Sequence, residues 1–404
     1  MSLNFSKSLS EYLEKIEVGP PLYDPKGNLQ NLVIYPVFPC SLAPHPPEII
    51  TLSTALEKGL RLTDTGVVSR VHVDNPLPVS VLASESETLI GSTQQRSVQF
   101  SCLIDPMRKA ALPVSCVEEG QPTEYQAEFS QTDTCPWSLR SFKMDQLARF
   151  GEPPQNWVWD QIKTYLADTA THSSTHNIHS VLDQNSHRLQ TLSKLFPPTP
   201  GQVGAICAVG QSLVIELFGD PEIFADRYDK VLRSALVEAL ARPSDKIVPA
   251  GKIPHFLNQI IEACQTTKVM NNRSLNENGR SLAFTHLGLS GQALIANGHL
   301  IHLSAHQQWP GQGQPLADLC PEMDAARADW ESHHPPFMDE LAHSYSRRLR
   351  RYNSFKSKLK PSSTNDDQQQ KTDDQNPDQD QSAPQPLPLN PGLHRFFLRI
   401  FNRD

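Results

Sequence analysis

The sequence predicts an α+β fold: a mainly antiparallel sheet with several packed helices, followed by a disordered C-terminal tail. Short runs of β-branched residues alternate with polar residues between Val67 and Val117. Two apolar hairpin patterns flank a long helical segment between residues 205 and 304. After residue 308 the composition changes to one with little apolar surface to bury.

The first elements are expected to be a strand and a short helix. The segment Asn28 to Phe38 has strand character, with Pro36 near its end. Ser53 is expected to cap a short helix that stops at Gly59, because glycine readily adopts the left-handed exit conformation.

Four β-like runs follow between Val67 and Val117, namely V-V-S-R-V-H-V, P-V-S-V-L, S-V-Q-F-S-C-L-I and A-L-P-V-S-C-V. Breaks at Asn75-Pro76 and Asp105-Pro106 separate them with turn chemistry and leave no room for crossover helices. The pattern therefore favours an antiparallel sheet over βαβ units. The polar, proline-rich residues 120–155 are expected to form a long loop or insertion.

Helical spacing returns at Trp157 to Leu166 and at Ile178 to Phe196. Asp220-Pro221 is a cap followed by a first-turn proline, which predicts a helix that continues to about Ala241. Gly210 breaks one apolar hairpin. Asn297-Gly298 is the preferred two-residue turn of the next, because both central residues need positive φ.

Composition bounds the class of protein. The chain has 404 residues, 38% of them hydrophobic, with a mean hydropathy of −0.43, so part of it is not expected to pack. A net charge of −8 argues against general nucleic-acid binding. No apolar run approaches the ~20 residues of a membrane span, and a signal-peptide core is absent from the N-terminus. Seven cysteines without C-x-x-C spacing predict reduced thiols and a cytoplasmic protein.

The predicted organisation is a single domain at 17–307, a partly helical extension at 308–360, a disordered linker at 361–391 and a short amphipathic segment at 392–404. As a helix, the segment Leu393 to Phe401 would separate an apolar face from an arginine face. It is too short to be stable alone, below the ~12–15 residue margin, so it must find a surface. A protein partner, a membrane interface and its own domain are all open.

The stretch from Ser86 to Glu118 is the best candidate site, because it places polar side chains between strands that are expected to be buried. Arg96 and Gln94 could present donors to a phosphate or carboxylate. Glu87 and Glu118 could act as a general base or accept sugar hydroxyls. The competing explanation is an internal ion-pair network that only holds strands together.

Several short motifs in one order carry a resemblance to a known family. They are N-L-x-x-L-x-I-Y-P-V, T-L-x-x-A-L-x-x-G, the Glu87–Arg96 segment, L-P-V-S-C-V-E, V-W-D-Q-I, G-Q-V-G-A and the last hairpin. From about Val18 to His306 the chain resembles the ARG and rhodanese-phosphatase-superfamily-associated protein domain, where ARG stands for ADP-ribosylglycohydrolase. The resemblance implies a link to ADP-ribose or NAD metabolism by association only.

Members of that family tend to read G-E-E-L-x-G-A-K-Q-N-R where this chain reads S-E-T-L-I-G-S-T-Q-Q-R. Thr88 stands where the family pattern has an acid, Thr93 where it has a lysine, and Gln95 where it has an asparagine. If that lysine were an acid, a base or a phosphate ligand, this chain would be altered or inactive. Whether it is an enzyme is left open.

The other motifs give weaker evidence of function. Gln202, in the G-Q-V-G segment before a strand, is expected to face the site as a ligand-binding residue, but the segment lacks the Rossmann order of strand, glycines and helix. Cys116 has no nearby base and is expected to be structural. His172, His176 and His179 would share a face only if one helix held all three, so no metal site is predicted. The cofactor is unknown.

Two functions remain. In the first, the domain binds or processes an anionic nucleotide ligand such as ADP-ribose or NAD. In the second, it is a non-catalytic interaction protein that recruits a partner through Leu393 to Phe401.

Overall fold

The computed structural model describes residues 2–27, 29–39, 48–265, 269–270, 275–276 and 279–307. All of them belong to one compact unit, Met1–Arg350. The predicted extension, the predicted disordered linker and the segment Leu393 to Phe401 lie outside the described residues.

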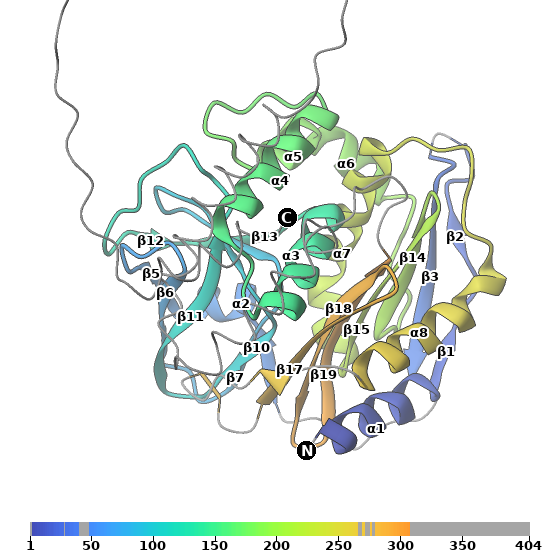
Figure 1. The fold of residues 1–404 in the computed structure, drawn as a ribbon, viewed down its shortest axis with the longest axis horizontal. Coiled ribbons are helices and arrows are strands. Elements are labelled where there is room, and N and C mark those ends of the chain that lie inside the picture. Colours follow the sequence, from blue (N-terminus) through green and yellow to red (C-terminus); the bar gives the residue numbers. More distant parts are fainter. Residues whose placement is uncertain are drawn as a thin grey trace, which may run out of the picture. The chain divides into compact units, whose positions relative to one another are not determined.

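A large antiparallel sheet forms one layer of this unit (Figure 1). Among the described residues its order is β1-β3-β14-β15-β19-β18-β17-β16, with β2 paired to β3. Its strands are β1 (Ile16–Val18), β2 (Leu22–Tyr23), β3 (Leu32–Pro39), β14 (Gly204–Val209), β15 (Ser212–Phe218), β16 (Val269–Met270), β17 (Gly279–His286), β18 (Leu289–Ala296) and β19 (His299–Gln307).

Two smaller sheets form a second group of strands. One has the order β12-β5-β6-β11-β9-β8-β13 and the other β10-β7-β4, where β4 and β7 are parallel. The strands are β4 (Ile49–Thr51), β5 (Arg61–Asp64), β6 (Arg70–Asn75), β7 (Ser80–Ala83), β8 (Glu87–Ile90), β9 (Arg96–Val98), β10 (Cys102–Ile104), β11 (Arg108–Cys116), β12 (Glu128–Phe129) and β13 (Gln131–Thr134). The prediction of an α+β fold with mainly antiparallel strands is confirmed.

Helices pack on both faces of the large sheet (Figure 1). The α-helices of the described residues are α1 (Ser2–Leu13), α2 (Leu52–Glu57), α3 (Trp137–Phe150), α4 (Gln155–Asp168), α5 (Ser180–Gln184), α6 (Ser186–Ser193), α7 (Pro221–Ala241) and α8 (Ile253–Gln265), of which α1, α3, α7 and α8 contact the large sheet. On β14, Ile206 and Ala208 belong to the apolar core under α8, whereas Cys207 and Val209 belong to the core on the side of α7. Alternating side chains of one buried strand thus serve two cores.

Helices α3 and α7 lie between the large sheet and the second group of strands. Helix α7 contacts β14 and β15 on one side and β4 and β13 on the other. Helix α3 contacts β17, β18 and β19 of the large sheet and also contacts α7. Polar side chains on these two helices therefore face both groups of strands.

Several local predictions are confirmed. The second hairpin turns at Asn297 and Gly298, with φ of 51° and 79°, and Gly210 breaks the first hairpin with φ of 54°. Helix α7 spans Pro221–Ala241, and the side chain of its cap, Asp220, accepts hydrogen bonds from the first turn.

The prediction of a loop over 120–155 is wrong, because β12, β13 and α3 lie there. The buried face of α3 includes charged and polar residues, so its composition resembles that of a loop; these residues are Arg140, Ser141, Lys143, Asp145 and Gln146. The cap of α2 is Thr51 rather than Ser53, and the helix predicted over 178–196 breaks into α5 and α6 at Asn185.

Candidate functional site

Glu87, the first carboxylate predicted for the site, begins β8 and is fully buried. Its Oε1 lies 2.5 Å from Nη1 of Arg227 and 3.1 Å from Nζ of Lys230, both on α7. Burial raises the pKa of Glu87, but the two cations outweigh burial and hold that pKa below its usual value. Glu87 is therefore an ionised group held against a helix.

The structure brings Gln94, Arg96 and Glu118 together at the other end of the same segment. Arg96 forms an ion pair with Asp64 at 3.0 Å and donates a hydrogen bond to the Gln94 carbonyl. Nε2 of Gln94 donates to the carbonyl of Glu118 at 2.9 Å. The hydrogen-bond and ion-pair partners of these three side chains differ from those of Glu87.

The remaining hydrogen bonds of Glu118 also stay inside the protein. Its carboxylate accepts from the Gln95 N–H at 3.1 Å and from the Thr175 hydroxyl at 2.7 Å. Gln202 lies apart from this group and stabilises a local turn, because its side chain accepts from the Thr199 N–H and donates to the Gly204 carbonyl.

Two weaker candidates have clear places in the fold. Cys116 is buried at the end of β11, and burial raises the pKa of its thiol. His172, His176 and His179 precede helix α5, which begins at Ser180, so they do not share a helix face. Within the described ranges no group of three His, Cys, Asp or Glu residues is placed to hold a metal ion.

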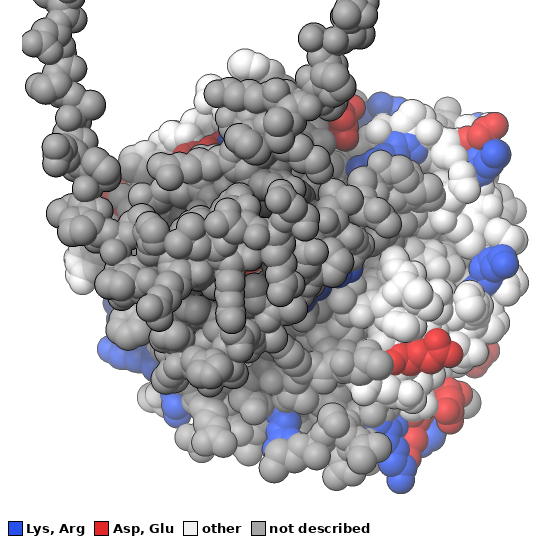
Figure 2. Space-filling model, viewed as in Figure 1, with Lys and Arg blue, Asp and Glu red and all other residues white. Residues whose placement is uncertain are grey.

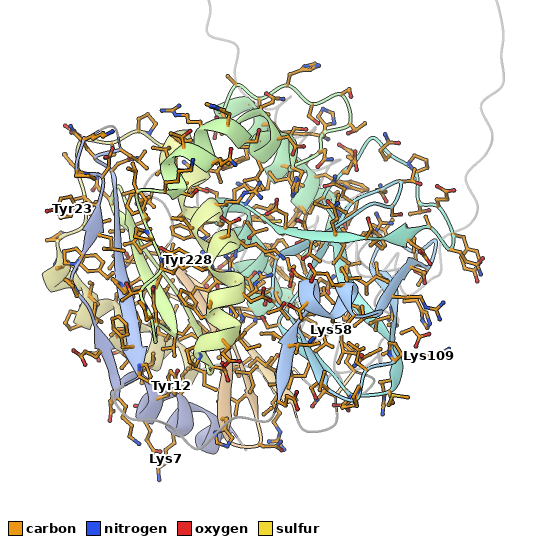
Figure 3. All side chains as sticks on the ribbon, turned by 180° about the vertical axis from the view of Figure 1, so that it is seen from behind. Lys7, Tyr12, Tyr23, Lys58, Lys109 and Tyr228 are labelled. Carbon is orange, nitrogen blue, oxygen red and sulfur yellow. The ribbon has the colours of Figure 1, made fainter. Side chains whose placement is uncertain are left out.

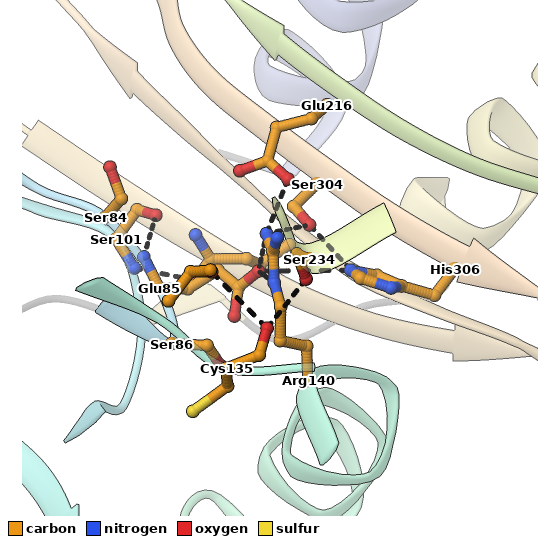
Figure 4. A network of polar contacts seen from close by, with 12 residues as sticks. Ser84, Glu85, Ser86, Ser101, Cys135, Arg140, Glu216, Ser234, Ser304 and His306 are labelled. Carbon is orange, nitrogen blue, oxygen red and sulfur yellow. Dashed lines mark hydrogen bonds and ion pairs between the residues drawn. The ribbon is translucent and has the colours of Figure 1, made fainter. Parts of the chain in front are cut away.

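Sequence reasoning missed a buried network centred on Arg140 of α3 (Figure 4). Its Nε donates to Glu85 at 2.8 Å, and its Nη2 lies 2.7 Å from the carboxylate of Glu216 on β15 and 3.0 Å from the Ser304 hydroxyl on β19. Nε2 of His306 lies 2.8 Å from the same hydroxyl. All of these side chains are at most 2% exposed.

The charges of this network stabilise one another. Burial opposes ionisation of Arg140, but Glu216 and Glu85 outweigh burial and raise its pKa. Burial also raises the pKa of each carboxyl group, and Arg140 outweighs that effect, so both carboxylates have lowered pKa values. Burial, followed by the Arg140 charge, lowers the pKa of His306 to about 3, so its ring is neutral at neutral pH.

Lys143, one turn after Arg140, is a buried amine whose hydrogen-bond partners are neutral. Its Nζ donates to the Ser97 hydroxyl at 2.7 Å, the Val98 carbonyl at 3.0 Å and the Ser86 hydroxyl at 3.4 Å. Burial lowers its pKa. Ser86 has φ of 55°, a conformation that is uncommon for serine.

A second missed group, the α7 cation cluster, consists of Arg227, Lys230 and Arg233. Spacing of three residues places them on one side of α7, which is seen from behind in Figure 3 with Tyr228 labelled. Their side chains are 3%, 14% and 27% exposed in chain order, so the cluster runs from the interior to the surface. This spacing was visible within the predicted helix and is the signal that could have found the cluster.

The α7 cation cluster shares two carboxylates. Arg227 and Lys230 contact Glu87, and Arg233 lies 2.9 Å from Asp133 of β13. Nζ of Lys230 also contacts hydroxyls of Ser53 and Thr132. Polar groups from α2, β8, β13 and α7 therefore meet at the outer end of Glu87.

Elsewhere on the surface the charge is mixed. The described part of the face in Figure 2 shows both acidic and basic side chains, and neither sign covers it. No helix among the described residues is long and apolar enough to span a membrane.

Comparison with known proteins identifies a family. The family model described as the ARG and Rhodanese-Phosphatase-superfamily-associated Protein domain matches residues 19–306, which is more than half of the chain. No curated protein and no solved structure matches. The family name records an association with ADP-ribosylglycohydrolases and with the rhodanese and phosphatase superfamilies, and the chain belongs to the ARG and Rhodanese-Phosphatase-superfamily-associated Protein domain family.

Proposed function

We propose that this protein binds an anionic ribose-phosphate ligand of the ADP-ribose or NAD class at the α7 cation cluster. The observation that carries the proposal is the position of Lys230. Its amine reaches Glu87 in the interior, yet its side chain is still 14% exposed, and Arg233 continues the positive charge outward. The family name supports the ligand class by association only.

The chemistry of the cluster suits such a ligand. A phosphate pairs with the point charge of Lys230 and with the planar guanidinium of Arg233. The buried carboxylate of Glu87 holds Lys230 in position from the interior rather than contacting the ligand itself. The hydroxyls of Ser53 and Thr132, which contact Lys230, can hydrogen-bond to the phosphate or to the ribose of the ligand.

The other predicted site residues have a supporting role in this proposal. Gln94, Arg96 and Glu118 bond to one another or to neighbouring backbone groups, and Gln202 stabilises a turn. Gln94, Arg96 and Glu118 hold the segments next to β8, the strand that carries Glu87. Direct contact of a ligand with Arg96 would require the buried ion pair with Asp64 to break, which is costly.

Isothermal titration calorimetry of the full chain with ADP-ribose and with NAD tests the proposal. The wild type is expected to bind one of them, and Lys230→Met is expected to weaken binding at least tenfold, about 1.4 kcal/mol. Arg227 still pairs with Glu87 in this variant, so the fold is retained. Lys109→Met, on the exposed side of β11, is the matched control and should bind as the wild type does. Absence of binding heat for both ligands with the wild type would exclude the proposal.

The alternative is a non-catalytic interaction protein. The observation that favours it is the internal pairing of Arg96, Gln94 and Glu118, which leaves those side chains engaged within the fold. The proposed docking segment, Leu393 to Phe401, lies outside the described residues. Pull-downs with and without residues 361–404 discriminate between the two functions. Recovery of the same proteins with both chains would show that the segment does not recruit them.

Cytoplasmic localisation also remains a proposal. The described free cysteines, Cys102, Cys116, Cys135, Cys207 and Cys264, are all buried. Fractionation of cells that express the full chain tests it directly.

A further inference from the structure

Three buried side chains outside the α7 cation cluster form a linear hydrogen-bonded series. The hydroxyl of Ser101 lies 2.7 Å from Nδ1 of His302, and Nε2 of that ring lies 3.2 Å from Oε1 of Glu216. Ser101 comes from the segment before β10, whereas His302 and Glu216 come from the adjacent strands β19 and β15. A hydroxyl, an imidazole and a carboxylate in this order are the parts of a nucleophilic relay.

The surrounding donors determine the direction of each hydrogen bond. The backbone N–H of Glu85 donates to the Ser101 hydroxyl oxygen at 2.8 Å, so the serine proton is free to point at Nδ1 of His302. That nitrogen is then an acceptor, and the ring proton on Nε2 faces Glu216. Arg140, 2.7 Å from Glu216, keeps this carboxylate ionised. The serine proton is thus directed at a base whose other nitrogen is oriented by a carboxylate.

An unpaired donor belongs to the side chain that accepts the backbone N–H of Ser101. Oε1 of Gln292 accepts the backbone N–H of Ser101 at 2.8 Å, which identifies the other end of this side chain as the amide nitrogen. That Nε2 is buried and has no hydrogen-bond partner among the described residues. An unpaired N–H group on a side chain bonded to the backbone of the nucleophile is the kind of group that stabilises an oxyanion.

We infer that Ser101, His302 and Glu216 form a second, hydrolytic site that acts on small acyl esters, with Gln292 as its oxyanion donor. Oγ of Ser101 bonds to the ester carbonyl carbon while its proton passes to Nδ1 of His302. The bond from that carbon to the alkoxy group then breaks, and the leaving alkoxide takes the proton from His302. Water attacks the acyl-serine by the same route, giving its proton to His302, which returns a proton to Ser101 Oγ.

Burial determines how a substrate reaches the site. Ser101 and His302 are fully buried, and Glu216 is 1% exposed. A cavity of about 10 Å³, room for about one water molecule, is lined by Phe100, Cys102 and Ser281 but not by Ser101 itself. An ester or a labelling reagent therefore reaches Ser101 only during local opening of the fold.

Labelling of the full chain with diisopropyl fluorophosphate, followed by peptide mass spectrometry, tests the inference. The wild type is expected to form one adduct, on Ser101, and to hydrolyse p-nitrophenyl acetate. Ser101→Ala should abolish both. His302→Gln should slow labelling by at least about 100-fold, because it removes the base. Ser141→Ala, which removes another buried hydroxyl on α3, is the matched control and should label as the wild type does.

The folded wild type alone can overturn the inference, so an unstable variant does not decide the result. A wild type that gives no adduct under native conditions, or an adduct on another residue, contradicts a nucleophilic Ser101. Equal labelling rates for His302→Gln and the wild type contradict the role of the base. Labelling requires no nucleotide ligand, so this test and the calorimetry with ADP-ribose can fail independently.

Discussion

Arg140 lies 2.7 Å from the carboxylate of Glu216, and this contact joins helix α3 to strand β15 of the large sheet. The same guanidinium donates to Glu85, in the segment before β8. One cation thus links the helix layer to both groups of strands. Because all three side chains are at most 2% exposed, water cannot replace the cation when it is removed.

Arg140→Met is therefore expected to destabilise the protein strongly. It leaves two carboxylates buried without a cation, and breaking a buried pair in this way costs about 3–5 kcal/mol. Guanidinium chloride unfolding followed by circular dichroism measures the loss. Arg61→Met removes an ion pair whose arginine is 66% exposed, so its cost should stay below about 1 kcal/mol. Equal unfolding midpoints for the two variants would show that Arg140 does not hold the layers together.

Lys143→Met should behave differently, although Lys143 lies only one turn from Arg140. The lysine hydrogen-bonds to neutral acceptors, Ser97, Val98 and Ser86, so no buried carboxylate loses its partner. Leaving the three acceptors of Lys143 without a donor costs about 1–3 kcal/mol. Part of this cost is offset, because the variant no longer has to bury an amine. The loss in the free energy of unfolding should therefore be smaller than that of Arg140→Met by at least about 2 kcal/mol. The same denaturation series measures it, and an equal or larger loss would mean that Lys143 carries a charge essential to the network.

Locally encoded elements could be predicted from the sequence. The turn at Asn297-Gly298 and the cap at Asp220 depend on neighbours within a few residues, and both formed as expected. Helix α3 could not be predicted, because burial of Arg140 depends on Glu85 and Ser304, which are 55 and 164 residues away in sequence. Composition shows that a segment is polar, but it does not show that distant residues pair with its polar side chains and allow them to be buried in a helix.

The candidate site shows the same limit. Glu87 was recognisable as a polar residue within a buried stretch, but its partner Arg227 is 140 residues away. Likewise Ser101 and His302 are separated by 201 residues, and no spacing rule in the sequence connects them. Residue types at short range indicated where buried polar groups occur, whereas the sheet pairing determined which of them meet.

Acidification should destabilise the protein, and His306 should contribute to this loss. Below pH about 6.5 the unfolded chain takes up a proton on this histidine, whereas the folded protein does so only near pH 3. The unfolded state thus binds more protons between these values, and stability falls by roughly 1 kcal/mol per pH unit from this group alone. The lowered pKa values of Glu85 and Glu216 act with the same sign below pH 4.5, the value from which they are lowered.

His306→Gln separates this contribution from that of the other histidines. Its loss of stability between pH 7 and pH 5, measured by urea unfolding, should be smaller than that of the wild type by roughly 1–2 kcal/mol. His255→Gln is the control, because His255 is exposed on α8 and meets water in both states. If both variants keep the pH dependence of the wild type, the folded protein does not hold His306 neutral.

Gly91 tests whether the loop after β8 is as tightly packed as the contacts indicate. Its φ is 113°, and a Cβ atom there would lie 2.5 Å from Oγ and 2.9 Å from the backbone nitrogen of Ser130. Gly59 has a similar φ of 103° with nothing within 4 Å, so Gly59→Ala carries backbone strain alone, about 1–2 kcal/mol. Gly91→Ala adds a clash with backbone, typically about 1–3 kcal/mol more. Thermal unfolding of the two variants compares them directly. Equal melting temperatures would mean that the chain at Ser130 moves aside without cost, and that β8 is held less rigidly than its pairing with β13 implies.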